Sequence, residues 1–247
     1  MPFERNVMTK KSIHKDFFSA YDVYVFDLDG TLYYQKPFRI RMLLYLLTYG
    51  MTHPGKIGEF FLLKEYRSVR EKWDECISDH IGKQLDRELP LEDLQYAYVA
   101  KKNKVETQRV KDAVQFFMME VPLGILPGFR DPITCNWIRS LRESGKKVIV
   151  YSDYPVKDKL ECFGLMVDGM YTSADEKIGC MKPDPKGLQV IMTEWRVDKE
   201  RIVMIGDRYE KDGLAAEENG IDYLILSSRK KERIQMDRLL RSDSGTQ

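Results

Sequence analysis

The chain has 247 residues, which is long enough for one large domain or for two. Hydrophobic residues make up 43% of it and charged residues 32%, a balance typical of ordinary globular proteins. The 40 Lys and Arg residues nearly cancel the 39 Asp and Glu residues, so the formal net charge is only +1. This value excludes a whole-chain attraction to nucleic acid or to an anionic membrane, and leaves open only a local basic patch.

The cysteines and the N-terminal residues indicate the compartment. Four cysteines are scattered without a CxxC pair, which argues against a zinc site and against a disulfide framework. Residues 1–15 lack the continuous apolar core of a signal peptide. We therefore expect a cytoplasmic protein with reduced thiols. The most apolar stretch, residues 42–47, is too short to span a membrane, and we expect it in the core of a helical unit.

The first third of the chain changes from strand to helix. Residues 1–20 are expected to form a polar arm, and the β-branched and aromatic run that begins at Val23 predicts a buried strand. Apolar residues then recur at helical spacing within residues 37–50, 57–63, 91–101 and 105–119, with no strand pattern between them. Residues 34–124 are therefore expected to form an all-helical unit inserted after the first strand.

From residue 125 onward, strand and helix patterns alternate. Short β-branched runs at 148–151, 202–205 and 223–226, with a brief one at 170–171, predict strands. Helical patterns lie between them, at 132–144, 156–163, 185–195 and 213–219. Such alternation predicts an α/β fold with a doubly wound parallel sheet, built from residues 21–33 and 125–228. Residues 229–247 are expected to be a polar C-terminal tail, helical at its start.

The end of the first strand is the strongest candidate for a site. The apolar run stops at Asp27-Leu28-Asp29-Gly30-Thr31, so that two carboxylates lie one residue apart at the mouth of a buried strand. They repel each other and lose hydration there, and a chain keeps them mainly where a cation or a reaction uses them. Strand ends of an open α/β sheet are also where ligands bind.

Other polar residues are expected at the same edge of the sheet. Ser152 follows the strand at 148–151, Asp207 follows the strand at 202–205, and Asp212 comes five residues later. Lys182 lies in a proline-rich loop before a helix. Gathered carboxylates suit Mg²⁺, and a lysine with a hydroxyl suits a phosphoryl group. The residues thus predict phosphoryl transfer to an aspartate, followed by hydrolysis of the aspartyl-phosphate by water.

These residues resemble the haloacid dehalogenase (HAD) superfamily, whose four separated motifs occur here in the family order. They are Asp27-Leu28-Asp29-Gly30-Thr31, Ser152 after its strand, Lys182 in Lys182-Pro183-Asp184-Pro185, and Gly206-Asp207 through Asp212. The resemblance spans residues 22 to about 226 and implies a Rossmann-like core. It identifies residues 34–124 as the helical cap domain that smaller members carry after the first motif.

The resemblance also implies a role for each acid. Asp27 would be the nucleophile and a Mg²⁺ ligand. Asp29 would protonate the leaving oxygen and then deprotonate water, with its backbone carbonyl on the metal. Asp207 would complete the metal site. Asp212 would be a second carboxylate beside the metal or an orienter of Lys182.

The remaining motif residues would hold the substrate, a small phosphorylated metabolite. Ser152 and Lys182 would bind the phosphoryl oxygens, and Gly30 and Thr31 would let the loop turn close to them. Neither a nucleic acid nor a membrane is expected as a partner.

Several alternatives stay open. Asp212 alone could cap the helix that begins near Gly213. The basic series of the cap, which includes Arg67 and Arg70, could face an anionic substrate, although a solvated helix face is favoured. A phosphomutase of the same fold, or a regulatory module without activity, is carried beside the phosphatase. A dehalogenase is disfavoured, because cleavage of carbon–halogen bonds needs no proton donor at Asp29.

Overall fold

The computed structural model describes residues 17–242, which separate into two compact units. The core unit comprises the described residues up to 37 and from 126 onward, and the cap unit comprises residues 38–125. Most of the expected N-terminal arm, residues 1–16, lies outside the described range. Residues 17–20 form a short helix, α1 (Phe17–Ala20), with Phe17 buried.

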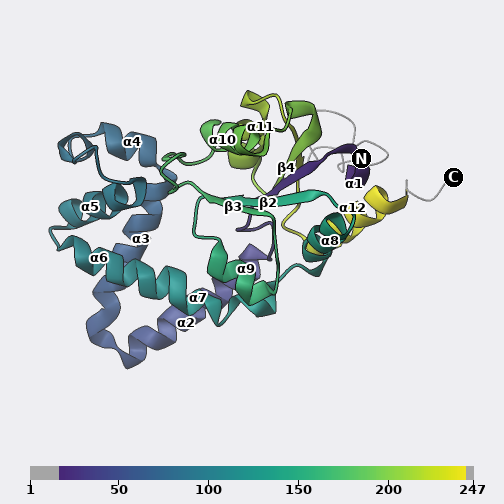
Figure 1. Cartoon of the computed structure of the whole chain (residues 1–247). Helices are drawn as coiled ribbons and strands as arrows, with labels where there is room; N and C mark the ends of the chain where they lie inside the picture. The colour runs from purple at the N-terminus through teal and green to yellow at the C-terminus, as the bar shows by residue number, and fades with distance from the viewer. Residues whose placement is uncertain (1–16, 243–247) are drawn as a thin grey trace, which may run out of the picture. The chain divides into compact units, whose positions relative to one another are not determined.

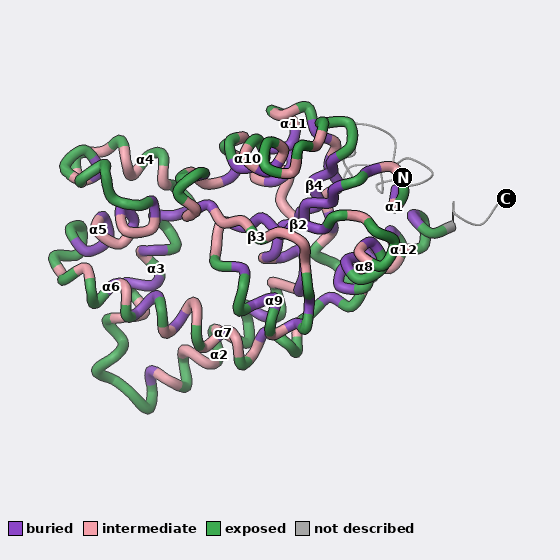
Figure 2. Tube along the Cα trace, viewed as in Figure 1, coloured by how far each residue is buried: buried purple, intermediate pink, exposed green. Residues whose placement is uncertain are grey.

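The core unit is built on a five-stranded sheet in the order β3-β2-β1-β4-β5, with every neighbouring pair parallel. The strands are β1 (Val23–Phe26), β2 (Lys147–Ser152), β3 (Gly169–Thr172), β4 (Ile202–Gly206) and β5 (Asp222–Ile225). All residues of β1 and β4 are buried, as expected for inner strands covered by helices on both faces (Figure 2). The predicted doubly wound α/β fold is confirmed.

Strand order fixes where a ligand site can form. The chain runs outward from β1 to β2 and β3, then returns to β4 on the other side of β1. Val25 is paired with Ile149 of β2 on one side and with Met204 of β4 on the other. Ligands usually bind where the strand order of such a sheet reverses, and here that place is at the carboxyl ends of β1 and β4.

Helices cover both faces of the sheet (Figure 1). Apolar residues of α10 and α11 join Val25, Ile149 and Met204 in one buried cluster, and α8 and α12 lie on the opposite face. The helices of the core unit are α8 (Pro132–Glu143), α9 (Lys157–Phe163), α10 (Lys186–Trp195), α11 (Leu214–Glu218) and α12 (Lys230–Ser242).

Helix α12 corrects the expectation of a polar tail from residue 229. Met236 and Leu240 are buried, and the Arg233 side chain is only 1% exposed. The sequence pattern missed this packing because most of the helix is charged, so its few buried positions do not form a clear apolar stripe.

The cap unit is helical throughout its regular structure. Its helices are α2 (Gln35–Thr52), which begins in the core unit, α3 (Ile57–Glu71), α4 (Trp73–Ser78), α5 (Leu91–Asn103), α6 (Thr107–Val114) and α7 (Val121–Leu123). Residues of α3, α5 and α6 form its buried cluster, which includes Tyr66, Val99 and Val110.

Arg70 shows that the basic series of the cap is not simply a solvated face. Its side chain is buried, and its Nη1 donates to the hydroxyl of Tyr66 at 3.1 Å and to Oε1 of Gln95 at 2.6 Å. Arg67 on the same helix is exposed. The favoured interpretation is therefore wrong for Arg70, which stabilises the interior of the cap.

The expectation that residues 42–47 form cap core is also wrong in part. These residues lie in α2 as a helix, but Leu43, Leu44 and Leu47 are 50–58% exposed. Among the described residues, no helix is both long enough and apolar enough to cross a bilayer.

Candidate active site

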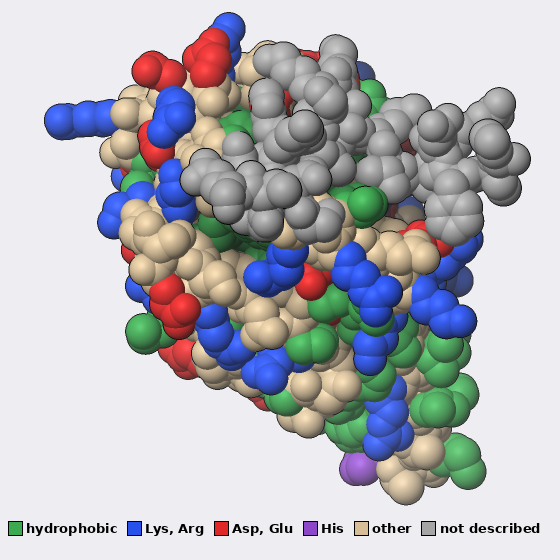
Figure 3. All heavy atoms as spheres, turned by 90° about the vertical axis from the view of Figure 1, so that its right-hand side faces the viewer, with side chains coloured by type: hydrophobic (Ala, Val, Ile, Leu, Met, Phe, Trp, Pro, Cys, Tyr) green, Lys and Arg blue, Asp and Glu red, His purple; other side chains and the backbone are tan. Residues whose placement is uncertain are grey.

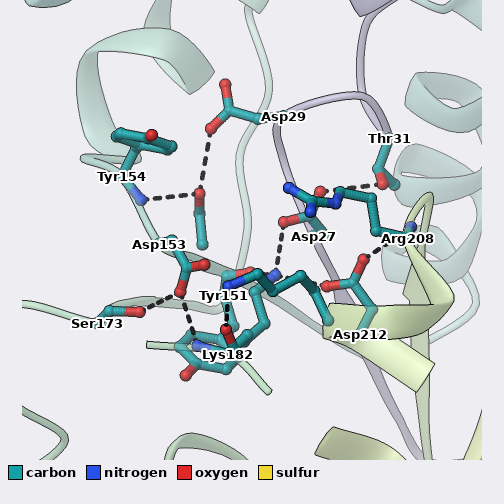
Figure 4. Close-up of polar contacts among 12 residues, drawn as sticks. Asp27, Asp29, Thr31, Tyr151, Asp153, Tyr154, Ser173, Lys182, Arg208 and Asp212 are labelled. Carbon is teal, nitrogen blue, oxygen red and sulfur yellow. Dashed lines mark hydrogen bonds and ion pairs between the residues drawn. The ribbon is translucent and has the colours of Figure 1, made fainter. Parts of the chain in front are cut away.

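Lys182 lies at the centre of the site, between two carboxylates (Figure 4). Its Nζ is 2.7 Å from Oδ1 of Asp27, which follows β1, and 2.6 Å from Oδ1 of Asp212, which follows β4. All three side chains are almost completely buried. The topology thus brings together residues 155 and 30 positions apart, as the sequence predicts.

Asp207 adds a third carboxylate. Asp27, Asp207 and Asp212 each offer one oxygen, and these oxygens all lie within 4.8 Å of one another. The neighbouring glycines leave room for this crowding. Gly30 has a φ of +105°, and a Cβ atom there would clash with the Asp207 carboxylate, while a Cβ at Gly206 would clash with Asp212.

Three carboxylates, two of them buried and that of Asp207 half-buried, lie near one ammonium group, and the pKa values of Asp27 and Asp207 show the imbalance. Burial raises the pKa of Asp207 from 3.8 to about 7, and the charge of Asp212 adds to the rise. Burial also raises the pKa of Asp27 well above its usual value, against the opposing effect of Lys182. Burial alone would lower the pKa of Lys182, but Asp212 and Asp27 outweigh it and raise that pKa. The site carries excess negative charge.

A divalent cation fits this arrangement. Oδ1 of Asp207 is buried and accepts no hydrogen bond from any described residue, although a buried carboxylate oxygen normally has a partner. Hard carboxylate oxygens are the donors that Mg²⁺ prefers. Asp27, Asp207 and Asp212 could hold such an ion with their side chains. The carboxyl group of Asp29 is not one of the three, and its expected contact through the backbone carbonyl stays a prediction.

The carboxyl group of Asp29 is held in a separate cluster. Ser152 Oγ donates to its Oδ2 at 3.2 Å, and the Tyr33 hydroxyl donates to its Oδ1 at 2.6 Å. Lys159 Nζ lies 2.7 and 3.0 Å from the two oxygens. Burial alone would raise the pKa of Asp29, but the charge and hydrogen bonds of Lys159 outweigh it and lower that pKa. Asp29 is therefore an ionised, firmly oriented carboxylate.

Thr31 and Arg233 hold the loop that follows β1. Thr31 Oγ1 donates to Oδ2 of Asp27 at 3.1 Å. The buried Arg233 donates to the backbone oxygens of Gly30 and Thr31 and pairs with Asp131 at 2.8 Å. These contacts leave Thr31 oriented toward the nucleophile candidate rather than toward solvent.

The flanking residues support the loops. Asp153 accepts from the backbone N–H of Lys182 at 3.0 Å and from the Ser173 hydroxyl. Asp212 does not cap α11, because it lies within the helical turn Tyr209–Gly213, and the N-cap of α11 is Gly213. It accepts instead from the N–H of Arg208 at 3.2 Å and from Lys182. The capping alternative is wrong.

Three residues that contact the site were not predicted from the sequence. They are Tyr33, Lys159 and Arg233. Lys159 lies 130 positions from Asp29, and Arg233 lies 203 positions from Gly30. Only Tyr33 could have been suspected from the sequence, because it lies four residues after Asp29. The structure thus brings all predicted site residues to one sheet edge, while their catalytic roles stay predictions.

Comparison with solved structures shows the same fold. A 2-haloacid dehalogenase from Pseudomonas syringae pv. Tomato DC3000 is 18% identical, with a TM-score of 0.54 over 82% of this chain and 85% of that one. The L-2-haloacid dehalogenase from Xanthobacter autotrophicus, solved with chloropropionic acid covalently bound, is 15% identical, with a TM-score of 0.53 over 92% and 84%. The HAD-hydrolase YfnB from Bacillus subtilis, bound to magnesium, is 16% identical, with a TM-score of 0.52 over 83% and 88%.

Sequence comparison identifies the family. No curated protein matches the chain. Residues 21–220, however, match the family described as haloacid dehalogenase-like hydrolase, and this range includes every motif residue from Asp27 to Asp212. The chain therefore belongs to the haloacid dehalogenase-like hydrolases.

Proposed function

We propose that the protein is a Mg²⁺-dependent phosphatase that hydrolyses a small phosphomonoester through an aspartyl-phosphate on Asp27. One observation carries the proposal: three carboxylates, two of them buried, and Lys182 are gathered around the end of β1, and a buried oxygen of Asp207 accepts no hydrogen bond from the described residues. This arrangement suits a dianionic phosphoryl group and the cation that would accompany it.

In the first step, a carboxylate oxygen of Asp27 attacks phosphorus, and the bond between phosphorus and the ester oxygen breaks. Thr31 and Lys182 orient Asp27 through one oxygen each. Bound Mg²⁺ would neutralise charge that develops on the phosphoryl oxygens. Lys182 and Ser152 supply donors for the same oxygens.

Asp29 moves the protons. It gives a proton to the departing alkoxide in the first step and takes one from water in the second, when that water displaces phosphate from Asp27. The ionised state that Lys159 favours is the state needed for the second step. A bound dianionic phosphoryl group raises the pKa of a neighbouring carboxyl group, which favours the protonated state needed for the first.

Dehalogenation is the main competing activity, because several proteins of similar fold are haloacid dehalogenases. Displacement of halide from carbon by a carboxylate needs neither a proton donor for the leaving group nor a divalent cation. Here Asp29 is present and is oriented by Ser152 and Lys159, and three carboxylates crowd together. Both features favour phosphoryl transfer.

The test is a screen of phosphorylated metabolites and of para-nitrophenyl phosphate, with free phosphate as the readout. 2-Chloropropionate is tested in parallel with halide as the readout. We expect Mg²⁺-dependent release of phosphate, its loss with a chelator, and a loss of at least about 10³-fold in Asp27→Asn. Release of halide but not phosphate would replace the proposal by dehalogenation. Conversion of a sugar phosphate to its isomer without release of phosphate would indicate a phosphomutase.

A further inference from the structure

Helix α2 is apolar on two opposite sides. At about 100° per residue, Phe38, Met42, Tyr45 and Tyr49 fall on one side of the helix. A second set falls within about 100° on the other side and is called here the outer stripe. It consists of Ile40, Leu43, Leu44, Leu47 and Met51.

The two sides differ sharply in exposure. On the inner side, Phe38 is buried and Met42, Tyr45 and Tyr49 are partly buried. The residues of the outer stripe are 62%, 56%, 50%, 58% and 83% exposed, in chain order. A helix that is apolar all round normally lies in a protein core or in lipid, and contiguous exposed apolar surface marks an interaction site. The outer stripe therefore needs an apolar partner.

The charges around the stripe identify the kind of partner. No Asp or Glu occurs between Asp29 and Glu59, whereas Lys36, Arg39 and Arg41 lie in the first half of α2. By the same helical geometry, Arg39 and Arg41 flank the outer stripe, one on each side. On the face drawn in Figure 3, hydrophobic and basic side chains lie together along the lower right, without acidic ones among them. In a chain with a net charge of only +1, this segregation marks a local basic patch.

A second copy of the chain fits these charges poorly. A twofold interface pairs the same surface patch on both subunits. It would place the arginines of one copy against a segment of the other that contains basic residues and no carboxylate between residues 30 and 58. An anionic bilayer surface fits both features, because leucines enter the acyl boundary while flanking arginines meet lipid phosphates.

We propose that α2 is a membrane-surface helix, which binds its outer stripe to a bilayer that contains anionic lipid. The helix has 18 residues and lies in the plane of the surface without crossing the bilayer. The inference goes beyond the proposed phosphatase activity and is independent of it.

The experiment is co-sedimentation of the full chain with vesicles of phosphatidylcholine alone and with vesicles in which about a third of the lipid is phosphatidylglycerol. We expect binding to the anionic vesicles only, reduced by high salt. Leu43→Ser combined with Leu47→Ser should weaken it about a hundredfold, because two leucines leave the apolar phase. Arg39→Gln should weaken it about fivefold, as one interfacial charge is lost.

A matched control separates the stripe from general surface hydrophobicity. Leu239→Ser combined with Met166→Ser alters two side chains that are 61% and 73% exposed in the core unit, and should leave binding unchanged. Circular dichroism and thermal unfolding check that each variant folds. Equal binding to both kinds of vesicle, or equal loss in the control variant, would overturn the proposal. The proposal would also be overturned if the wild type bound no vesicles and formed a dimer by light scattering, while the Leu43→Ser/Leu47→Ser variant was a monomer.

Discussion

Replacing Asp207 by Asn tests the crowding of carboxylates in the site. Burial and Asp212 raise the pKa of Asp207 from 3.8 to about 7 in the folded protein. The folded state therefore holds this proton more tightly than the unfolded state, and stability falls as pH rises between these two values. Above pH 7 in the absence of metal, the ionised carboxyl group costs the fold about 4 kcal/mol, which is the upper limit of what Asp207→Asn can recover.

The assay is urea unfolding of wild type and Asp207→Asn in chelator at pH 8 and pH 5. We expect the variant to be more stable at pH 8, with the gain falling to about 2 kcal/mol or less at pH 5, where Asp207 of the folded wild type is protonated. Saturating Mg²⁺ should stabilise the wild type more than the variant, so that the difference between their free energies of unfolding disappears. Asp198→Asn, at an exposed position, should change little at either pH. A variant no more stable than wild type at pH 8 would refute the reasoning.

Two further substitutions probe the supports of the site. Lys159→Met removes the cation that lowers the pKa of Asp29, which must be protonated in the first step. The basic limb of the kcat/KM profile should therefore move to higher pH. Lys157→Met, on the exposed side of α9, should leave that limb in place, and an unmoved limb in Lys159→Met would remove Lys159 from the mechanism. Gly30→Ala should lower the free energy of unfolding by about 2 kcal/mol or more, because of its positive φ and the clash with the carboxylate behind it. Gly128→Ala, which meets no atom within 4 Å, should change it by less than about 0.5 kcal/mol, and equal effects in urea unfolding would contradict the packing argument.

Much of the fold follows from local patterns. The buried strand at Val23 and the β-branched run near Ile149 were recognisable because inner parallel strands are apolar on both faces. The alternation of such runs with helices then gave the doubly wound topology. Asp27, Ser152 and Asp207 were found together for the same reason, since the carboxyl ends of parallel strands share one edge.

The residues that the sequence did not reveal act over long distances. Lys159 looks like either of the two lysines on a charged helix, and only the folded chain places its ammonium group on Asp29. Arg233 lies in a segment with too few apolar positions to indicate burial, yet it reaches the carbonyl groups of the loop after β1. The spacing of residues along the sequence cannot show such contacts, because neither Lys159 nor Arg233 lies in a local turn or at a strand end that would fix its position.

For helix α2, the local pattern was recognised but the exposure of its residues was predicted wrongly. Its apolar residues at helical spacing predicted the helix correctly, but not which side would be covered. A helix that is apolar on two sides offers no contrast in sequence between the buried side of Tyr49 and the exposed side of Leu47.

The most direct test of the central claim is the site of covalent phosphorylation. Asp29→Asn should slow hydrolysis of the aspartyl-phosphate, whereas para-nitrophenolate departs without a proton donor, so the intermediate should accumulate. After incubation of this variant with para-nitrophenyl phosphate and Mg²⁺ and an acid quench, we expect peptide mass spectrometry to find one phosphoryl group on Asp27. A phosphoryl group on another residue, or none while para-nitrophenol is released, would contradict the mechanism.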